Sequence, residues 1–272
     1  MHPEPYAWPA ASDAFALVPA LSVAYYLVVR PYGFERRRVA CFVVAQLLLL
    51  AVFATPLETL ALNRLVTAHF LQNVTVAEWA PALLVLSLPP ALGCRIRVPM
   101  LPALVAWLGT YFLWHVPAVY DFALRHSHSV LHLEHATYLL AGLALWWPVV
   151  HGRANAITKA AYLFAAFVLA SPLGLLLALV PDPLYGFYAA RPTIWGWSHL
   201  LDQQIAGTTM AVEQAIVFIA GFTFFFLRFL RDEERAGEAE PQRESQPLSS
   251  SARAPSTPAR QTSSTSSSSG RG

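Results

Sequence analysis

Residues 46–54 read QLLLLAVFA, and residues 140–147 read LAGLALWW. Neither run alternates apolar and polar residues, whereas the strands of a membrane barrel do so strictly, so helix is the expected state. Together with five further apolar stretches they predict spans long enough for a hydrocarbon core of about 30 Å. The seven stretches are 14–29, 39–60, 66–89, 98–120, 129–150, 156–180 and 206–230. The sequence therefore predicts an all-α, polytopic membrane protein with a seven-helix transmembrane bundle.

The composition excludes several classes of protein. Of the 272 residues, 56% are hydrophobic and only 12% are charged, against about 45–50% and about 25% in soluble domains. The net charge is +2, and many of the basic residues lie at or beyond Arg228, which leaves no basic face for nucleic acid. Cys41 and Cys94 are the only cysteines, so a disulfide scaffold and a four-cysteine metal site are excluded.

Basic residues predict the orientation, because short cytoplasmic loops are enriched in Lys and Arg. One set of loops carries only Arg64, Arg125 and Arg191. The other set, with the end of the last span, carries Arg30, Arg36, Arg37, Arg38, Arg95, Arg97, Arg153, Lys159, Arg228, Arg231 and Arg235. We expect the N-terminus outside and the C-terminus in the cytoplasm.

Three regions follow from this reading. Residues 1–13 form an outer segment without the basic residues of a secretory signal peptide, so the first helix should be retained. Residues 14–232 form the transmembrane domain, in which prolines such as Pro56 and Pro117 predict kinked or interrupted helices. Residues 233–272 are rich in Ser, Pro, Arg and Glu and are expected to be a disordered cytoplasmic tail.

Histidines gather toward the outer side of the predicted bundle. The densest segment, HSHSVLHLEH, covers residues 126–135. On a helix His128, His132 and His135 would form one column, with Glu134 about 100° away from His135. Such a carboxylate is better placed to accept from the second N–H of a metal-bound histidine than to belong to the histidine column itself.

Two more histidines, His69 and His115, reach a similar depth from other helices. A nitrogen-rich site without thiolate suits copper or zinc, and Met210 adds a thioether of the kind that Cu(I) accepts. The predicted metal ligands are His69, His115, His132 and His135. The same residues could instead form a hydrogen-bonded network that fixes helix packing, and His126, His128 and His199 suit the membrane interface.

A second polar group lies at the outer entrance of the last span. It comprises Asp202, Gln203, Gln204, Glu213 and Gln214. Its acids could offset the charge of a bound cation or relay protons, and they could equally cap helices. We treat Asp202, Gln203 and Glu213 as auxiliary candidates beside the histidines, together with Glu134 and Met210.

Four segments carry a family resemblance: AHFLQNVTVAEWAPALLVL (68–86), FLWHVPAVYDFAL (112–124), HLEHATYLLAGLALWWPVV (132–150) and WGWSHLLDQQIAGTTM (195–210). They resemble the CtaG-like cytochrome c oxidase assembly factors, polytopic proteins of bacterial plasma membranes implicated in making active caa-type oxidase. The family pattern corresponds to His69, His115, the pair His132 and His135, and the DQQ segment beginning at Asp202. One position departs from it, because Asn73 stands where the family has a second histidine in the helix of His69.

The resemblance implies a non-enzymatic membrane protein whose partners are cytochrome c oxidase subunits. Joined to the ligand argument, it predicts an assembly factor that binds copper near the outer membrane face. Two rivals follow from the same histidines. A haem-binding electron-transfer protein could use two of them as axial ligands, and a copper permease would need polar groups through the whole membrane. The chain lacks GxSxG and HExxH, so no hydrolase is predicted.

Overall fold

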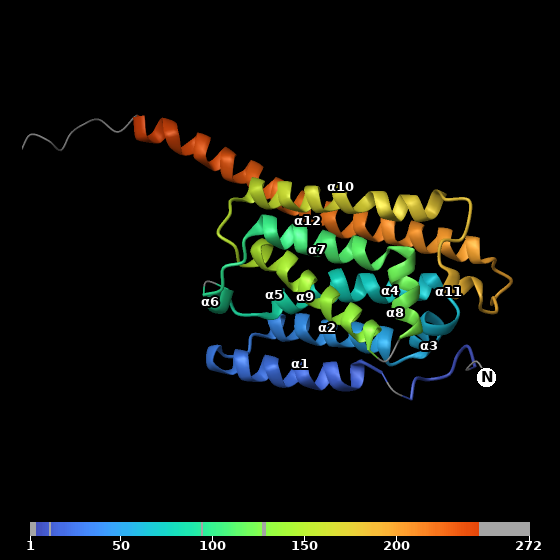
Figure 1. The fold of residues 1–272 in the computed structure, drawn as a ribbon. Coiled ribbons are helices and arrows are strands. Elements are labelled where there is room, and N and C mark those ends of the chain that lie inside the picture. The colour runs from blue at the N-terminus through green and yellow to red at the C-terminus, as the bar shows by residue number, and fades with distance from the viewer. Residues whose placement is uncertain (1–3, 11, 94, 127–128, 245–272) are drawn as a thin grey trace, which may run out of the picture. The chain divides into compact units, whose positions relative to one another are not determined.

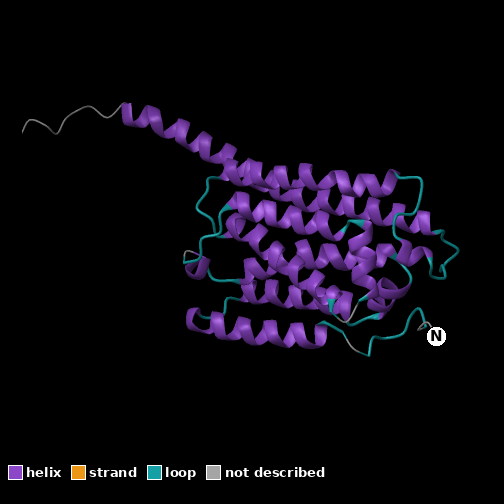
Figure 2. Ribbon diagram, viewed as in Figure 1, coloured by secondary structure: helices purple, strands orange, loops and turns teal. Residues whose placement is uncertain are grey.

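The computed structural model describes residues 4–10, 12–93, 95–126 and 129–244, and every regular element in these ranges is helical. The chain divides into two compact units, Met1–Phe229 and Leu230–Gly272. Figures 1 and 2 show the long helices of the first unit running along a common direction. In chain order they are α1 (Ala14–Val29), α2 (Arg36–Phe53), α7 (Met100–Trp114), α9 (Val130–Val150), α10 (Ala156–Leu179) and α12 (His199–Glu244).

Two predicted spans are bent at the expected prolines. The stretch 39–60 forms α2 followed by α3 (Pro56–Asn63), and the two helices meet at 51°. The stretch 98–120 forms α7 followed by α8 (Pro117–Arg125), at an angle of 74°. Both prolines stand at the first position of the second helix, where the missing N–H costs nothing. His115 lies at the second bend, where its side chain turns into the bundle.

A third span changes its helical pitch instead of bending. Residues 66–87 form α4 (Val66–Val74), a π-helical turn (Thr75–Trp79) and α5 (Ala80–Ser87) in succession. A π turn shifts the following side chains around the helix axis and is found mostly at functional sites. The carbonyl of Ala77 in this turn faces Gly142 of α9, where a Cβ atom would come within 2.3 Å of the oxygen. The absence of a side chain at residue 142 thus lets α9 pack directly on the turn.

Small residues also bring other helices together. In α10 and α12, Gly174 and Gly207 face each other, and a Cβ on Gly207 would stand 2.7 Å from the carbonyl oxygen of Gly174. The helices α2 and α9 both pack on α5, while α7 packs on α9 and α10. The short helices α6 (Pro90–Gly93) and α11 (Gly186–Ala189) lie in connections. Large apolar side chains such as Leu101, Leu140, Leu179 and Ile216 remain exposed, as a bundle facing lipid requires.

The membrane prediction is supported in its coarser form. Among the described residues, three helices are long and apolar enough to cross a membrane: Ala14–Tyr32, Ala156–Leu179 and His199–Gly237. Each bent pair, α2 with α3 and α7 with α8, could supply one more span, which makes up to five. The predicted count of seven and the orientation of the termini stay predictions.

The second unit begins within α12. This helix continues through residue 244, so residues 233–244, at the start of the segment expected to be disordered, are helical. Good helix formers such as Glu, Arg and Ala dominate these residues, which accounts for the extension. The remainder of that segment, 245–272, lies outside the described residues.

Candidate functional site: a buried histidine cluster

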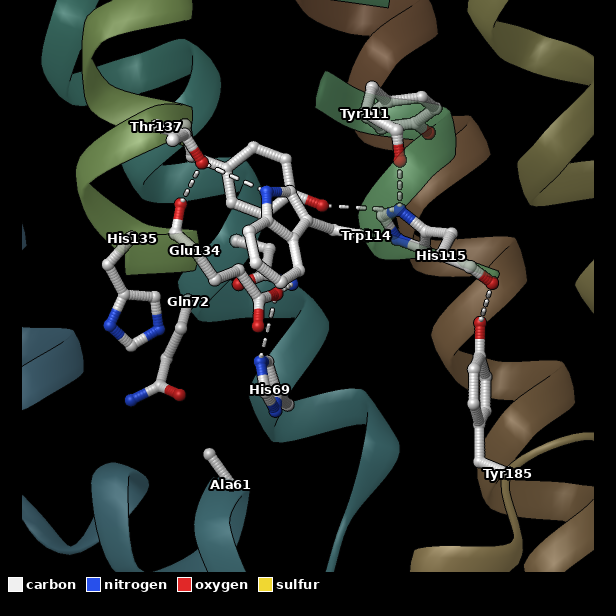
Figure 3. A network of polar contacts seen from close by, with 12 residues as sticks. Ala61, His69, Gln72, Tyr111, Trp114, His115, Glu134, His135, Thr137 and Tyr185 are labelled. Atoms are coloured by element: carbon white, nitrogen blue, oxygen red, sulfur yellow. Dashed lines mark hydrogen bonds and ion pairs between the residues drawn. The ribbon is translucent and has the colours of Figure 1, made fainter. Parts of the chain in front are cut away.

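The centre of the first unit holds a polar cluster formed by His69, Glu134 and His135, here called the histidine cluster. His69 comes from α4, and the other two residues come from α9. His69 and Glu134 are fully buried, and His135 is 5% exposed. The imidazole rings of His69 and His135 lie 6.3 Å apart between centroids, and Nε2 of His69 lies 3.6 Å from Oε1 of Glu134 (Figure 3). Three ionisable groups thus converge where water does not reach.

The Nδ1 atoms of the buried histidines are held by acceptors from other elements. Nδ1 of His135 lies 2.8 Å from a carboxylate oxygen of Asp13, which can only accept. Nδ1 of His69 lies 3.2 Å from the hydroxyl of Tyr188, whose own proton is donated to the carbonyl of Ala61. Both imidazoles therefore carry their proton on Nδ1.

The opposite nitrogens point into the cluster without partners. Nε2 of His69, Nε2 of His135 and Oε2 of Glu134 are buried and make no hydrogen bond among the described residues. With its proton on Nδ1, a neutral His69 presents a lone pair to the Glu134 carboxylate. Two facing acceptors repel each other, so a proton on Nε2 or a bound cation is needed to offset the repulsion.

His115 shows the same arrangement a short distance away. Its Nδ1 lies 2.7 Å from the backbone oxygen of Tyr111, so that nitrogen is the donor, and its Nε2 is buried without a partner. Phe70 packs edge-on against its ring, and the hydroxyl of Tyr185 donates to its carbonyl. Figure 3 shows His115 between Tyr111 and Tyr185, apart from the pair of His69 and His135.

The predicted ligand set is only partly brought together. In the part of the chain that the structure describes, no three side chains among His, Cys, Asp and Glu form a ready metal-binding group. His132 is 54% exposed and shares the Asp13 carboxylate with His135, so the two histidines lie on one side of α9 as expected, but only His135 is buried. His128 lies outside the described residues. Glu134, expected to lie outside the column as a partner carboxylate, lies against His69 of α4.

Asp13 is the functional residue that the sequence analysis missed. Its two carboxylate oxygens accept from His132 and His135, so it links an exposed imidazole to a buried one. Burial raises the pKa of Asp13, but its hydrogen bond to His135 and the charges of His135 and His132 more than offset this, and the pKa is lowered. A lone acid before the first helix gives no signal of this role, since its partner lies 122 residues away in sequence.

A groove leads from the surface to Asp13 and the two histidines that it contacts. It has a volume of about 440 Å³ and lies between α1 and α9, with apolar walls that include Leu17, Ala20 and Leu139. Asp13, His132 and His135 line it as well. The edge of the histidine cluster is therefore reachable from outside the bundle.

Two amide side chains donate hydrogen bonds to carboxylates in and near the histidine cluster. Asn73 donates to Oε1 of Glu134 at 3.0 Å. Asn73 thus binds the carboxylate at the position where the family pattern has a histidine. Nearby, Gln72 donates to the buried carboxylate of Glu58 and, at 2.7 Å, to the carbonyl of Val52.

The auxiliary candidates on α12 serve other contacts. Asp202 accepts from the backbone N–H groups of Val66 and Thr67 at 2.7 and 3.1 Å, so it satisfies the first free donors of α4. Gln203 accepts from the N–H of Leu184 at 2.6 Å and holds the connection after α10. Met210 and Glu213 are buried as well, and Met210 lines a narrow internal void together with His115.

A family model matches residues 23–232, which is most of the chain and includes the histidine cluster. Its description is the cytochrome c oxidase caa3 assembly factor. The chain belongs to this family. No curated protein and no solved structure matches the chain.

Proposed function

We propose that this assembly factor binds copper at the histidine cluster and hands it to a cytochrome c oxidase subunit. His69, His135 and Glu134 would be the inner ligands, and His115, with Met210 beside it, would offer a further nitrogen and a thioether. Imidazole, carboxylate and thioether together suit copper in its two oxidation states. The protein would act by ligand exchange with its partner and would not be an enzyme.

The observation that carries the proposal is the orientation of three buried imidazoles. Tyr188, Tyr111 and Asp13 each engage the Nδ1 of one histidine, and none of the three Nε2 atoms makes a hydrogen bond within the described part of the chain. Leaving buried polar atoms unpaired costs about 1–3 kcal/mol each, so the arrangement needs a compensating role. Metal-bound histidines typically have their second ring nitrogen held by a carboxylate or a carbonyl.

The groove between α1 and α9 supports a route for the ion. His132, exposed at its rim, shares the Asp13 carboxylate with His135, so an ion could pass between two imidazoles that lie next to each other. A partner with exposed ligands could then remove it from His132. This mode of transfer needs no polar path through the full membrane.

The proposed topology has seven spans with the N-terminus outside the bacterial plasma membrane. Length and composition allow up to five spans, and the continuous helical run 66–87 and the helix α9 would add the remaining two. Both carry buried polar residues, which lower their mean hydropathy without preventing insertion in a bundle. The histidine cluster would then lie toward the outer face.

The test is copper content after loading with Cu(I) in detergent, measured by mass spectrometry on wild type and His69→Ala/His135→Ala. We expect about one copper per wild-type chain and a large loss in the double variant, with a parallel fall in oxidase activity of membranes that carry it. His126→Ala is the matched control, because that histidine is exposed and bonds only within its own helix turn.

Absence of copper from loaded wild-type protein would overturn the proposal. An optical spectrum of the same samples checks the rival, since a bis-histidine haem shows a strong Soret band whereas copper bound to histidine does not.

A further inference from the structure

A second buried cluster contains acids without bases. Glu78, in the π turn, is fully buried, and Glu213 of α12 is 7% exposed. Hydrogen bonds bring the two side chains together crosswise, because Gln214, next to Glu213, donates to Glu78, and Trp79, next to Glu78, donates to Glu213. We refer to Glu78 and Glu213 as the acid pair.

The surroundings of the acid pair are polar and uncharged. Gln214 donates from its Nε2 to Oε1 of Glu78 at 3.1 Å and to the hydroxyl of Tyr111 at 2.9 Å. The indole N–H of Trp79 donates to Glu213. The titratable groups facing the pair from neighbouring helices are the hydroxyls of Tyr111 in α7 and Tyr138 in α9. None of these neighbours supplies a positive charge.

Two carboxylates can only accept hydrogen bonds, so neither can bond to the other without a proton. Two like charges close together inside an apolar bundle would also repel strongly, so one of the two groups must be neutral. The remaining oxygens, Oε2 of each glutamate and Oε1 of the fully buried Gln214, have no partner among the described residues. The acid pair therefore holds at least one proton and has acceptor atoms to spare.

The acid pair is connected to the histidines. A narrow internal void is lined by Glu78 of the acid pair together with His115, Met210 and Asn73. Asn73 bonds to Glu134 on the far side of this void. In addition, Tyr111 contacts Gln214 through its hydroxyl and His115 through its carbonyl. Few side chains therefore lie between the acid pair and the histidine cluster.

We propose that Glu78 and Glu213 form an internal proton-binding site, which releases one proton to the surrounding water when a monovalent cation enters the histidine cluster. The exchange leaves the net charge of the bundle interior unchanged, since one positive charge enters and one leaves. No bond other than the O–H bond breaks, and nothing is oxidised or reduced. Proton binding by Glu78 and Glu213 follows from the acid pair alone. Release of the proton when copper binds rests on the proposed copper function.

The test is infrared spectroscopy of the full chain in detergent at neutral pH, in water and in heavy water. A protonated carboxyl group gives a carbonyl stretch separate from carboxylate bands, and this stretch shifts in heavy water. We expect the band in the wild type and its loss in Glu78→Gln and in Glu213→Gln. Glu35→Gln is the matched control, because Glu35 is exposed and paired with Arg38.

The same samples are then loaded with Cu(I), and proton release is followed with a pH indicator in weak buffer. Loss of the band together with about one proton released per copper bound supports the exchange. Absence of the band from wild type before loading overturns proton binding by the acid pair. Copper bound without any change in the band overturns the exchange, whereas a band without bound copper contradicts only the copper function.

Discussion

The histidine cluster and the acid pair are both buried, but they balance charge in different ways. In the histidine cluster the carboxylates of Glu134 and Asp13 have imidazoles beside them. In the acid pair, Glu78 and Glu213 have only each other and neutral donors. The first arrangement leaves lone pairs for a cation, and the second must keep a proton. The identity of the neighbours, more than burial, decides what a buried carboxylate can bind.

Removing Glu134 should have the largest effect. Glu134→Ala removes the acceptor of the Asn73 amide and leaves a buried void beside His69, and a buried polar group without its partner costs about 1–3 kcal/mol. We expect a marked loss of stability in a detergent unfolding titration and a loss of bound copper. Glu134→Gln keeps the volume and should recover much of the stability but not the copper, and copper bound by Glu134→Gln as well as by the wild type would contradict the role of the carboxylate.

Adding a methyl group at Gly142 should disturb the acid pair more than the histidine cluster. Its Cβ would collide with the carbonyl of Ala77 in the π turn, and such overpacking typically costs about 1–3 kcal/mol. We expect Gly142→Ala to lower thermal stability and to change the infrared band of the protonated carboxyl. Gly109→Ala, also in a helix but with nothing within 4 Å, should be neutral or slightly stabilising. If Gly142→Ala left the thermal stability unchanged, the π turn would be able to move aside for the added methyl group without a cost in free energy.

Asp13→Asn should weaken the cation site without unfolding the bundle. The amide is a weaker acceptor for the Nδ1–H of His135, and loss of such a supporting carboxylate typically lowers metal affinity about 10–100-fold. Competition with a Cu(I) chelator measures the change. The acid pair should keep its infrared band, so loss of that band in Asp13→Asn would argue against the separation of the two clusters.

The smallest effect is expected at Asp202. Its contacts to Val66 and Thr67 close the start of α4, and removal of a helix cap costs about 1 kcal/mol. Asp202→Ala should therefore lower the unfolding midpoint modestly and leave copper stoichiometry unchanged. A loss of copper equal to that of Asp13→Asn would return Asp202 to the candidate ligands.

The apolar runs were enough to predict a helical membrane protein, because only helices and closed barrels satisfy backbone groups in lipid and these runs lack the alternation of barrel strands. The bends at Pro56 and Pro117 were also predictable from residue type. The π turn was not, since nothing in TVAEW differs from an ordinary helix, and its register depends on Gly142 of another helix.

Among the site residues, His69, His115 and His135 were predicted by their depth and spacing. Their supporting groups were not, because Asp13 and Tyr188 meet them only through tertiary packing, across 122 and 119 residues of sequence. His132 shows the limit of helical spacing as a guide. It lies three residues from His135, yet it stays at the surface because the groove begins there.

X-ray absorption at the copper edge of Cu(I)-loaded protein tests the central claim most directly. The account predicts the scattering pattern of imidazole rings around the metal, and its loss in His69→Ala/His135→Ala but not in His126→Ala. Copper surrounded only by buffer ligands, or a spectrum unchanged by the double substitution, would contradict it.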